Sequence, residues 1–189
     1  MAQHKRSIMD VEDYLVLNRN SKNIRYEYLD GEIKMLAGGS PDHSILIANL
    51  TTAIKGPLKG SQCRVYNSDV QLQLSEKRYV YPDITVSCDQ RDRNQKEAIR
   101  YPCVVIEVLS PTTEATDRGR KAAYYRACPT IQEYMMVDSE EIFVEVHRRE
   151  GGKWTINSFE PGDIVILESL GIQFPIEDAY EGTSLTNET

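Results

Sequence analysis

The segment Tyr101-Pro102-Cys103-Val104-Val105-Ile106-Glu107-Val108-Leu109-Ser110-Pro111 decides how the rest of the chain can be arranged. Between its two prolines, six of the seven residues from Cys103 to Leu109 are apolar. A short apolar run of this kind predicts a strand that is buried on both faces. Glu107 falls near its end, on the face shared by Val105 and Leu109. A buried carboxylate is costly unless a cation or hydrogen-bond donors compensate it, so other parts of the sequence must supply them.

The length and composition predict a single globular domain. The chain has 189 residues, of which 40% are hydrophobic and 27% charged, and no Pro/Gly/Ser-rich linker divides it. We expect one domain over residues 1–180 and a flexible polar tail over 181–189. No apolar stretch reaches transmembrane length and the first residues lack a signal peptide's apolar core, so we expect a cytoplasmic protein without membrane contact.

The four cysteines are spread through the chain without the paired spacing of a metal site. This distribution is typical of reduced cysteines in an intracellular protein. We therefore expect free thiols at Cys63, Cys88, Cys103 and Cys128.

The net charge of −7 argues mildly against a sequence-independent nucleic-acid coat protein, because a polyanion is attracted by local cationic surface. It does not exclude a nucleic-acid enzyme, whose acidic metal site would contribute to the total. Basic residues gather in two segments, which taken alone are most simply solvated faces. The first holds Arg91, Arg93, Lys96 and Arg100, and the second holds Arg118, Arg120, Lys121 and Arg126.

Turn residues and periodicity predict the elements that precede the buried strand. In chain order they are a helix opening at Ser7, a β-hairpin around Asp30-Gly31, a helix from Ser40-Pro41 to Gly56-Pro57, a half-exposed strand over 70–74, a returning strand over 79–86 and a surface loop over 87–100. Pro82 limits the ladder of the returning strand because it has no N–H to donate. Asp83 therefore falls where the sheet can splay open.

The elements after the buried strand continue the mixture of helix and strand. They are a helix from about Asp117 to Cys128 and strands over 133–137, 142–147, 154–156 and 164–167. We expect the last of these strands to close the sheet. The pattern as a whole predicts an α/β fold.

Asp83, Glu107 and Lys121 form the combination with the clearest chemical meaning. Hard divalent cations take carboxylate ligands, and a nearby ammonium can orient a water or stabilise charge on phosphoryl oxygens. An Asp and a Glu on neighbouring strands, with a Lys on the following helix, therefore suit metal-assisted phosphodiester hydrolysis. The spacing alone is a weak signal. Taken singly, Asp83 could belong to a turn, Glu107 could pair with an arginine, and Lys121 could lie on a solvated helix face.

Several segments resemble the motifs of the PD-(D/E)XK nuclease superfamily, and more narrowly its branch of small bacterial restriction-endonuclease-like proteins. The segments are Pro82-Asp83, Val105 to Glu114 and Asp117 to Tyr125, joined by Tyr26 to Glu32, Gly39 to His43, Glu133-Tyr134 and Ser169 to Gly171. Together they extend from Tyr26 to Gly171. The resemblance implies a restriction-endonuclease-like core, with a mixed central β-sheet flanked by helices.

The resemblance also implies a catalytic site. It assigns Mg²⁺ or Mn²⁺ to Asp83, Glu107 and the backbone carbonyl of Val108. The usual Glu-x-Lys motif would place lysine at position 109, but this chain has Leu109 there. Lys121 on the following helix is the matching lysine, and the triad is complete only if its ammonium reaches the site. Glu27 and His43 match accessory positions.

The leading hypothesis is therefore a metal-dependent endonuclease that acts on DNA, as a homodimer whose two sites address two strands. Basic side chains would contact phosphates without specifying sequence, and the candidates are Arg91, Arg93, Lys96, Arg100, Arg118 and Arg120. A second hypothesis is an inactive nuclease-fold module that binds nucleic acid or a protein partner. A third is hydrolysis of RNA or a nucleotide rather than duplex DNA.

Overall fold

The computed structural model describes residues 8–21, 23–36, 38–111 and 113–186. The apolar segment forms strand β8 (Val104–Leu109), and all six of its residues are buried, as predicted. It lies inside a six-stranded sheet of order β11-β10-β9-β8-β6-β3. The other strands of this sheet are β3 (Arg64–Asn67), β6 (Ile84–Ser87), β9 (Glu133–Asp138), β10 (Val144–Glu150) and β11 (Lys153–Phe159).

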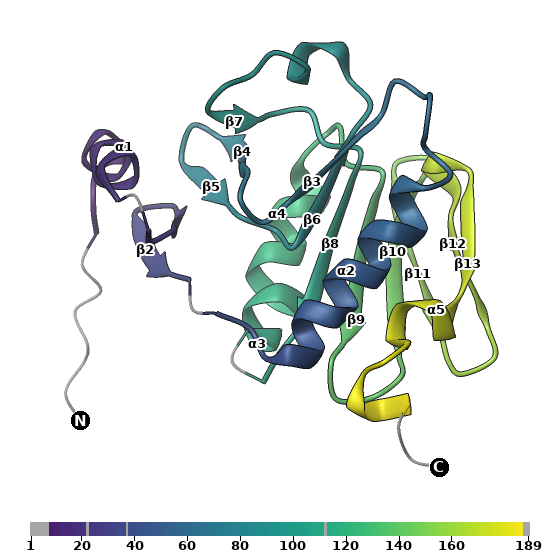
Figure 1. Ribbon diagram of the computed structural model, residues 1–189. Coiled ribbons are helices and arrows are strands. Elements are labelled where there is room, and N and C mark those ends of the chain that lie inside the picture. The colour runs from purple at the N-terminus through teal and green to yellow at the C-terminus, as the bar shows by residue number, and fades with distance from the viewer. Residues whose placement is uncertain (1–7, 22, 37, 112, 187–189) are drawn as a thin grey trace.

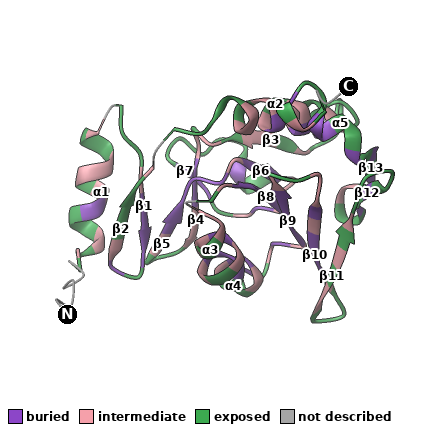
Figure 2. Ribbon diagram, turned by 90° about the horizontal axis from the view of Figure 1, so that it is seen from below, coloured by how far each residue is buried: buried purple, intermediate pink, exposed green. Residues whose placement is uncertain are grey.

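Strand β8 runs antiparallel to β6 and parallel to β9, so the central sheet is mixed. Its two faces are covered by different helices (Figures 1 and 2). One face packs under α2 (Pro41–Lys55) and α5 (Ile176–Tyr180), and the other under α3 (Glu114–Thr116), the π turn η2 (Asp117–Lys121) and α4 (Ala122–Ala127). An α/β fold with a mixed sheet flanked by helices is thus confirmed.

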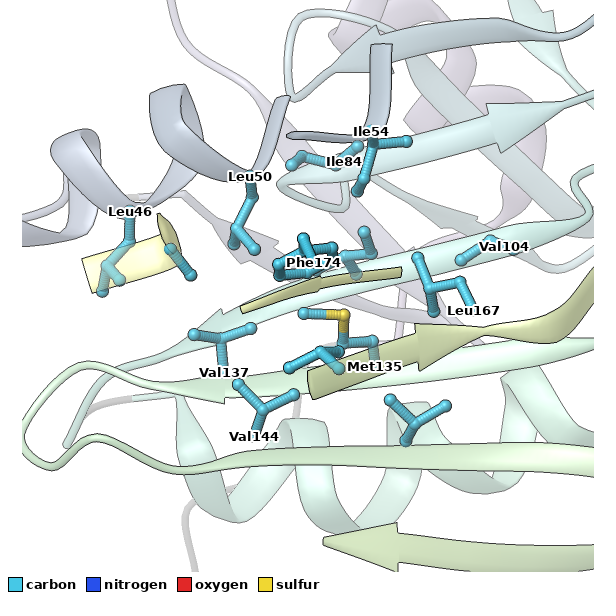
Figure 3. Packing of buried hydrophobic residues seen from close by; sticks show 14 of the residues in the cluster. Leu46, Leu50, Ile54, Ile84, Val104, Met135, Val137, Val144, Leu167 and Phe174 are labelled. Atoms are coloured by element: carbon cyan, nitrogen blue, oxygen red, sulfur yellow. The ribbon is translucent and has the colours of Figure 1, made fainter. Parts of the chain in front are cut away.

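Side-chain alternation along β8 divides the core into two clusters. Val104, Ile106 and Val108 pack toward α2, whose Leu46, Leu50 and Ile54 point into the same cluster (Figure 3). Val105 and Leu109 pack on the other face among residues of α4 such as Ala122 and Tyr125. Glu107 shares this second face by the two-residue period of a strand. The α3–α4 segment is therefore the part of the chain that meets its carboxylate.

A five-stranded sheet of order β2-β1-β5-β4-β7 lies beside the central sheet. Its strands are β1 (Tyr26–Leu29), β2 (Glu32–Met35), β4 (Gln71–Ser75), β5 (Arg78–Val80) and β7 (Ala98–Ile99). Asp30 and Gly31 join β1 to β2 with positive φ angles of 53° and 98°, which confirms the predicted tight hairpin. Helix α1 (Val11–Asn20) packs on this sheet through the fully buried Tyr14, which stacks on Tyr28. The predicted helix start at Ser7 lies outside the described residues.

The segment predicted as one returning strand over 79–86 is two strands. Strand β5 ends at Val80 in one sheet, and β6 begins at Ile84 in the other. Pro82 and Asp83 lie between them, because a residue without an N–H cannot extend the ladder. Asp83 therefore stands where the two sheets part.

Three further predictions need correction. Strand β12 (Ile164–Leu167) does not close the central sheet but pairs with β13 (Ile172–Pro175) in a separate two-stranded sheet. Only alternate residues of β12 are buried, which is the pattern of a strand with one face on the core. The predicted helix at Asp117 is already preceded by α3. The predicted loop over 87–100 ends in strand β7, which follows the 3₁₀ turn η1 (Gln90–Asp92).

Cys63 and Cys88 form a disulfide, contrary to the expectation of four free thiols. Cys63 precedes β3 and Cys88 follows β6, and the adjacent residues Arg64 and Ser87 face each other in the antiparallel ladder. The register of the two strands thus brings the thiols together. Cys103 and Cys128 are free.

Residues 181–186, the described part of the predicted tail, contact the rest of the chain, although four of the six are exposed. Thr183 is fully buried, and the Ser184 hydroxyl donates a hydrogen bond to Asp42 on α2. Asn49 of α2 also donates to the backbone carbonyl of Glu181. The segment includes the 3₁₀ turn η4 (Ser184–Thr186), and η3 (Glu168–Leu170) joins β12 to β13. No helix in the described part of the chain has the length and apolarity needed to cross a bilayer.

Candidate active site

The Lys121 ammonium, on the π turn η2, reaches the Glu107 carboxylate on strand β8. Its Nζ lies 3.0 Å from Glu107 Oε1, 2.9 Å from Glu27 Oε1 and 3.3 Å from Asp117 Oδ1. The π turn η2 contains both Asp117 and Lys121 and buries both side chains. π turns occur mostly as single turns within helices and often at functional sites. Three buried carboxylates from three elements therefore surround one ammonium.

Acidic groups outnumber the one ammonium in this cluster, and burial shifts the pKa values of the carboxyl groups. Burial raises the pKa of Glu107 to about 8, although Lys121 acts in the opposite direction. Burial also raises the pKa of Asp117. Burial opposes the charged form of Lys121, but Glu107, Glu27 and Asp117 outweigh it and raise the pKa of that ammonium. The lysine stays charged among more carboxylates than it can neutralise.

Tyr125 fixes the position of the Glu107 side chain. Its hydroxyl donates a hydrogen bond of 2.6 Å to Glu107 Oε1, the oxygen that also contacts Lys121. Burial raises the pKa of Tyr125 well above its usual range, so the hydroxyl retains its proton and remains a donor. The Tyr125 ring packs against Tyr134 of β9 at a centroid distance of 4.8 Å. Tyr125 and Lys121 thus both donate to Oε1 of the Glu107 carboxylate.

Asp83 lies next to Glu107 by the register of β6 and β8. Ile84 faces Ile106 across this antiparallel pair, so the next position on each strand is Asp83 and Glu107. The Asp83 carboxylate accepts a hydrogen bond of 2.8 Å from the Val108 backbone N–H. Its charge also contributes to the raised pKa of Glu107. The break between β5 and β6 thus places a second carboxylate, that of Asp83, next to Glu107.

His43 lies on the outer side of Asp83, in the first turn of α2. Its Nε2 is 3.4 Å from Asp83 Oδ2, and the hydrogen bond to Asp83 raises the pKa of His43. Ser40 caps the helix by accepting a hydrogen bond from the His43 backbone N–H. The side chains of His43 and Asp83 are 18% and 15% exposed, whereas that of Lys121 is 7% exposed. Solvent therefore meets this cluster at His43 and Asp83.

Glu27 enters the cluster from the hairpin strand β1. Its Oε1 accepts a hydrogen bond of 3.1 Å from the Tyr81 backbone N–H, in addition to the contact with Lys121. Its Oε2 is buried and has no hydrogen-bond partner among the residues that the structure describes. A buried carboxylate oxygen without a donor is costly, and a bound cation would remove that cost.

The oxygen donors fit a hard divalent cation. Asp83, Glu107 and the Val108 carbonyl offer two carboxylates and one backbone oxygen, and Mg²⁺ commonly takes one or two carboxylates with its other positions left to waters and phosphate oxygens. Among the described residues, no three His, Cys, Asp or Glu side chains form a metal site by themselves. The backbone carbonyl would therefore be needed.

The basic residues predicted to contact nucleic acid fall into two groups. Those of segment 91–100 lie away from the cluster, and Arg118 and Arg120 form ion pairs with acidic side chains. The segment with Arg91, Arg93, Lys96 and Arg100 follows the end of β6 opposite to Asp83. Arg91 pairs with Asp89.

The two arginines of η2 are held by acidic neighbours. Arg118 contacts Glu114 and Glu145. Arg120 contacts Glu32 at 2.6 Å and the Leu29 carbonyl, and so links the α3–α4 segment to the hairpin. Their main contacts in this structure are internal.

Sequence analysis did not assign a site role to Asp117 or Tyr125. Both lie four residues from Lys121, on the helical face that meets Glu107. The spacing of four residues from Lys121 was the only feature of the sequence that could have indicated either residue. Without the fold, nothing distinguished it from a solvated i, i+4 ion pair.

Comparisons with known proteins identify the family and the fold of this chain. Residues 11–177 match the family model Uma2, described as "Putative restriction endonuclease". The chain is 38% identical over 173 residues to "Uncharacterized protein slr1290" of Synechocystis sp. (strain ATCC 27184 / PCC 6803 / Kazusa), covering 90% of each chain. It is 29% identical over 149 residues to "Uncharacterized protein sll1609" of the same organism, covering 77% of this chain and 84% of that one.

A crystal structure of a "putative nuclease belonging to DUF820" from Anabaena variabilis ATCC 29413 has the same fold. It superposes with a TM-score of 0.78 at 20% sequence identity, over 91% of this chain and 97% of the other. The predicted restriction-endonuclease-like core is thereby confirmed.

Proposed function

The chain belongs to the Uma2 family of restriction-endonuclease-like nucleases, and we propose from this premise that it is a metal-dependent endonuclease that cleaves DNA. The observation that carries the proposal is the proximity of Asp83, Glu107 and Lys121, which come from the residue before β6, from β8 and from the π turn η2. Separate elements supply two carboxylates and one ammonium to one place. This combination suits hydrolysis of a phosphodiester.

The metal in this proposal is Mg²⁺ or Mn²⁺, held by Asp83, Glu107 and the Val108 carbonyl. Such an ion neutralises phosphate charge and lowers the pKa of a water, which makes hydrolysis feasible at neutral pH. Asp83 is already oriented toward Val108 by the 2.8 Å hydrogen bond to its N–H. Tyr125 holds Glu107 by its 2.6 Å hydrogen bond. The protein therefore fixes both carboxylates before a ligand arrives.

Lys121 and His43 supply the protein's positive charge. The Lys121 ammonium, kept charged by its carboxylate neighbours, can orient a water or stabilise charge that develops on the phosphoryl oxygens. His43 lies at the exposed side, and its hydrogen bond to Asp83 favours the protonated imidazole. It can therefore hold a proton at the mouth of the site and give it to a leaving oxygen. A homodimer would present two such sites to the two strands of a duplex.

The test compares the wild type with Asp83→Ala and with Asp178→Ala, an exposed aspartate on α5 that serves as the matched control. Divalent-metal binding is measured by calorimetry, and nicking of supercoiled plasmid is followed in the same Mg²⁺ or Mn²⁺ buffers. We expect Asp83→Ala to lose both signals and Asp178→Ala to retain both. Absence of metal binding in the wild type would refute the enzyme proposal.

One observation favours the alternative of an inactive nuclease-fold module. Lys121 is occupied by three internal ion pairs, and both it and Glu107 are almost wholly buried. Such a closed cluster can stabilise the fold without chemistry. The alternative predicts nucleic-acid or protein binding that Asp83→Ala does not change. Metal binding without cleavage of DNA, RNA or nucleotides would support it.

A further inference from the structure

A second feature of the surface lies at the opposite end of α2 from His43. A groove of about 740 Å³ opens between the C-terminal half of α2, the segment 56–63 and strand β3. Strand β3 is an edge strand of the central sheet, so one side of its backbone has no neighbouring strand. Leu58 and Val65 supply apolar lining. The groove is open and has polar backbone along one wall.

Every charged residue that lines this groove is basic. These residues are Lys55, Lys59 and Arg64, and all three are exposed. Neither lysine forms an ion pair within the described residues, and the Arg64 guanidinium contacts only the neighbouring Cys63 carbonyl there. The stretch 51–67 contains no Asp or Glu, although the whole chain carries a net charge of −7. The groove is therefore a local cationic surface on an acidic protein.

Strand β3 connects the groove to the candidate active site. At the groove end, Arg64 faces Ser87 of β6, and at the other end Asn67 faces Ile84. Ile84 is the neighbour of Asp83 in the chain. The three residue steps from Arg64 to Asn67 span roughly 10 Å at the rise of a β-strand. The groove and the site thus lie at two ends of one sheet edge.

We propose that this groove binds the phosphodiester backbone of the nucleic-acid substrate on one side of the bond that is cleaved. The proposal rests on the proposed nuclease function and adds to it a second contact surface. Twelve helical residues separate His43 from Lys55, roughly 18 Å at 1.5 Å per residue, and phosphates follow one another at about 3.4 Å along one strand of B-DNA, so roughly five phosphates separate the groove lysines from the mouth of the site. A strand held by Lys55 and Lys59 would therefore reach Asp83 within a few nucleotides.

The shape of the groove favours an extended polyanion over a single phosphate group. Its cations lie on the helix, on the following segment and on the edge strand, and do not converge on one point of a closed pocket. The disulfide between Cys63 and Cys88 joins the groove wall to the start of the predicted basic segment. The exposed side chains of Arg93, Lys96 and Arg100 follow in that segment, so they would extend the same surface away from the active site.

The experiment uses the full chain with the charge-reversing double variant Lys55→Glu/Lys59→Glu. Its matched control is Lys77→Glu/Lys153→Glu, which reverses two exposed lysines elsewhere, one in the turn between β4 and β5 and one at the first position of β11. Binding of fluorescein-labelled 20-nucleotide single strands and duplexes is measured by anisotropy in EDTA, across a series of KCl concentrations. Nicking of supercoiled plasmid in Mg²⁺ is measured with the same preparations, and circular dichroism checks that each variant folds.

We expect the groove variant to bind at least about tenfold more weakly than the control variant. Its salt dependence should be shallower by nearly two units in the slope of log affinity against log salt, since each lost phosphate contact removes about 0.7 to 0.9. Equal affinity and slope in the two double variants, with a wild type that nicks DNA, would overturn the groove and leave the nuclease proposal standing. A wild type that neither binds nor nicks would overturn the nuclease proposal and the groove with it.

Discussion

Two buried glutamates on neighbouring strands of the central sheet have very different surroundings. Glu107 of β8 and Glu133 of β9 are 4% and 0% exposed. The strands run parallel with Val104 facing Glu133, so the two carboxylates lie toward opposite ends of the pair. Alternation also places them on opposite faces, Glu107 toward α4 and Glu133 toward α2 and β12. Comparable burial on the same sheet therefore allows a direct comparison.

Glu133 has a donor for each lone pair that it directs into the protein. Its Oε1 accepts from Arg148 Nε at 2.9 Å and from the Glu168 N–H at 3.0 Å, and its Oε2 accepts from the Ser169 N–H and hydroxyl. These bonds attach η3 to the sheet. A buried carboxylate that is paired and fully hydrogen-bonded acts as a structural anchor.

Glu107 is surrounded by other acids, with Glu27, Asp83 and Asp117 all near enough to influence it. One ammonium and one hydroxyl face its Oε1, and burial raises its pKa to about 8. A strongly perturbed pKa of this kind is typical of functional sites. The contrast indicates that a buried acid with too few donors is the better guide to chemistry, and one with all its donors is the better guide to stability.

The largest expected effect is on the activity of Glu107→Gln. The amide can still accept from Lys121 and Tyr125, but it cannot act as an anionic ligand, so nicking should fall on the order of 10³-fold. The free energy of unfolding should change by no more than about 1 kcal/mol, because the substitution also removes surplus negative charge. Plasmid nicking and urea unfolding measure the two effects. Glu160→Gln, at an exposed position, is the control, and wild-type nicking by Glu107→Gln would contradict the comparison.

The second prediction concerns Glu133→Gln, which should lower the free energy of unfolding by about 3 kcal/mol. The amide nitrogen cannot accept hydrogen bonds, so either the Ser169 donors or the Arg148 and Glu168 donors lose their acceptor in a buried place. Urea unfolding against Glu160→Gln measures the loss. Residual nicking per folded molecule should stay near the wild-type value. If Glu133→Gln and Glu107→Gln destabilise the protein equally, the distinction between the two glutamates fails.

The smallest expected effect is a difference in nicking activity between alanine substitutions at two adjacent glycines near His43. A Cβ at Gly39 would lie 2.5 Å from His43 Nδ1, whereas a Cβ at Gly38 would meet no atom within 4 Å. Gly39→Ala should therefore displace the imidazole from Asp83 and reduce nicking roughly tenfold. Gly38→Ala is the matched control with unchanged activity. Proton NMR of the His43 ring would report the displacement directly, and equal nicking by the two variants would remove His43 from the site.

Local patterns predicted the parts of the fold that depend on a few consecutive residues. The apolar run gave β8, Asp30-Gly31 gave the hairpin, and Ser40-Pro41 gave the start of α2. Pro82 correctly indicated a limit to the ladder, because a missing N–H is a local property. What followed the break, a change from one sheet to another, depends on distant strands and was not visible.

Predictions failed where pairing over long separations decides the outcome. Strand β12 was recognised as a strand, but its partner is β13 instead of the central sheet. The disulfide between Cys63 and Cys88 requires the register of β3 against β6. The site shows the same limit, since Lys121 was found through family resemblance and Asp117 was missed. An acid four residues before a lysine is common on solvated helices, and only the packing of η2 against β8 makes this one different.

The position of Lys121 on a helical segment, 14 residues after Glu107, ties the composition of the site to local unfolding. A lysine two residues along the strand would stay beside the glutamate as long as the sheet persists. Here the ammonium would leave the glutamate if the segment from Glu114 to Ala127 opened while β8 kept its hydrogen bonds to β6 and β9. Such openings have their own free energy, below that of global unfolding, and amide hydrogen exchange measures it. The fraction of molecules with a complete site would then equal the fraction in which this one segment is closed.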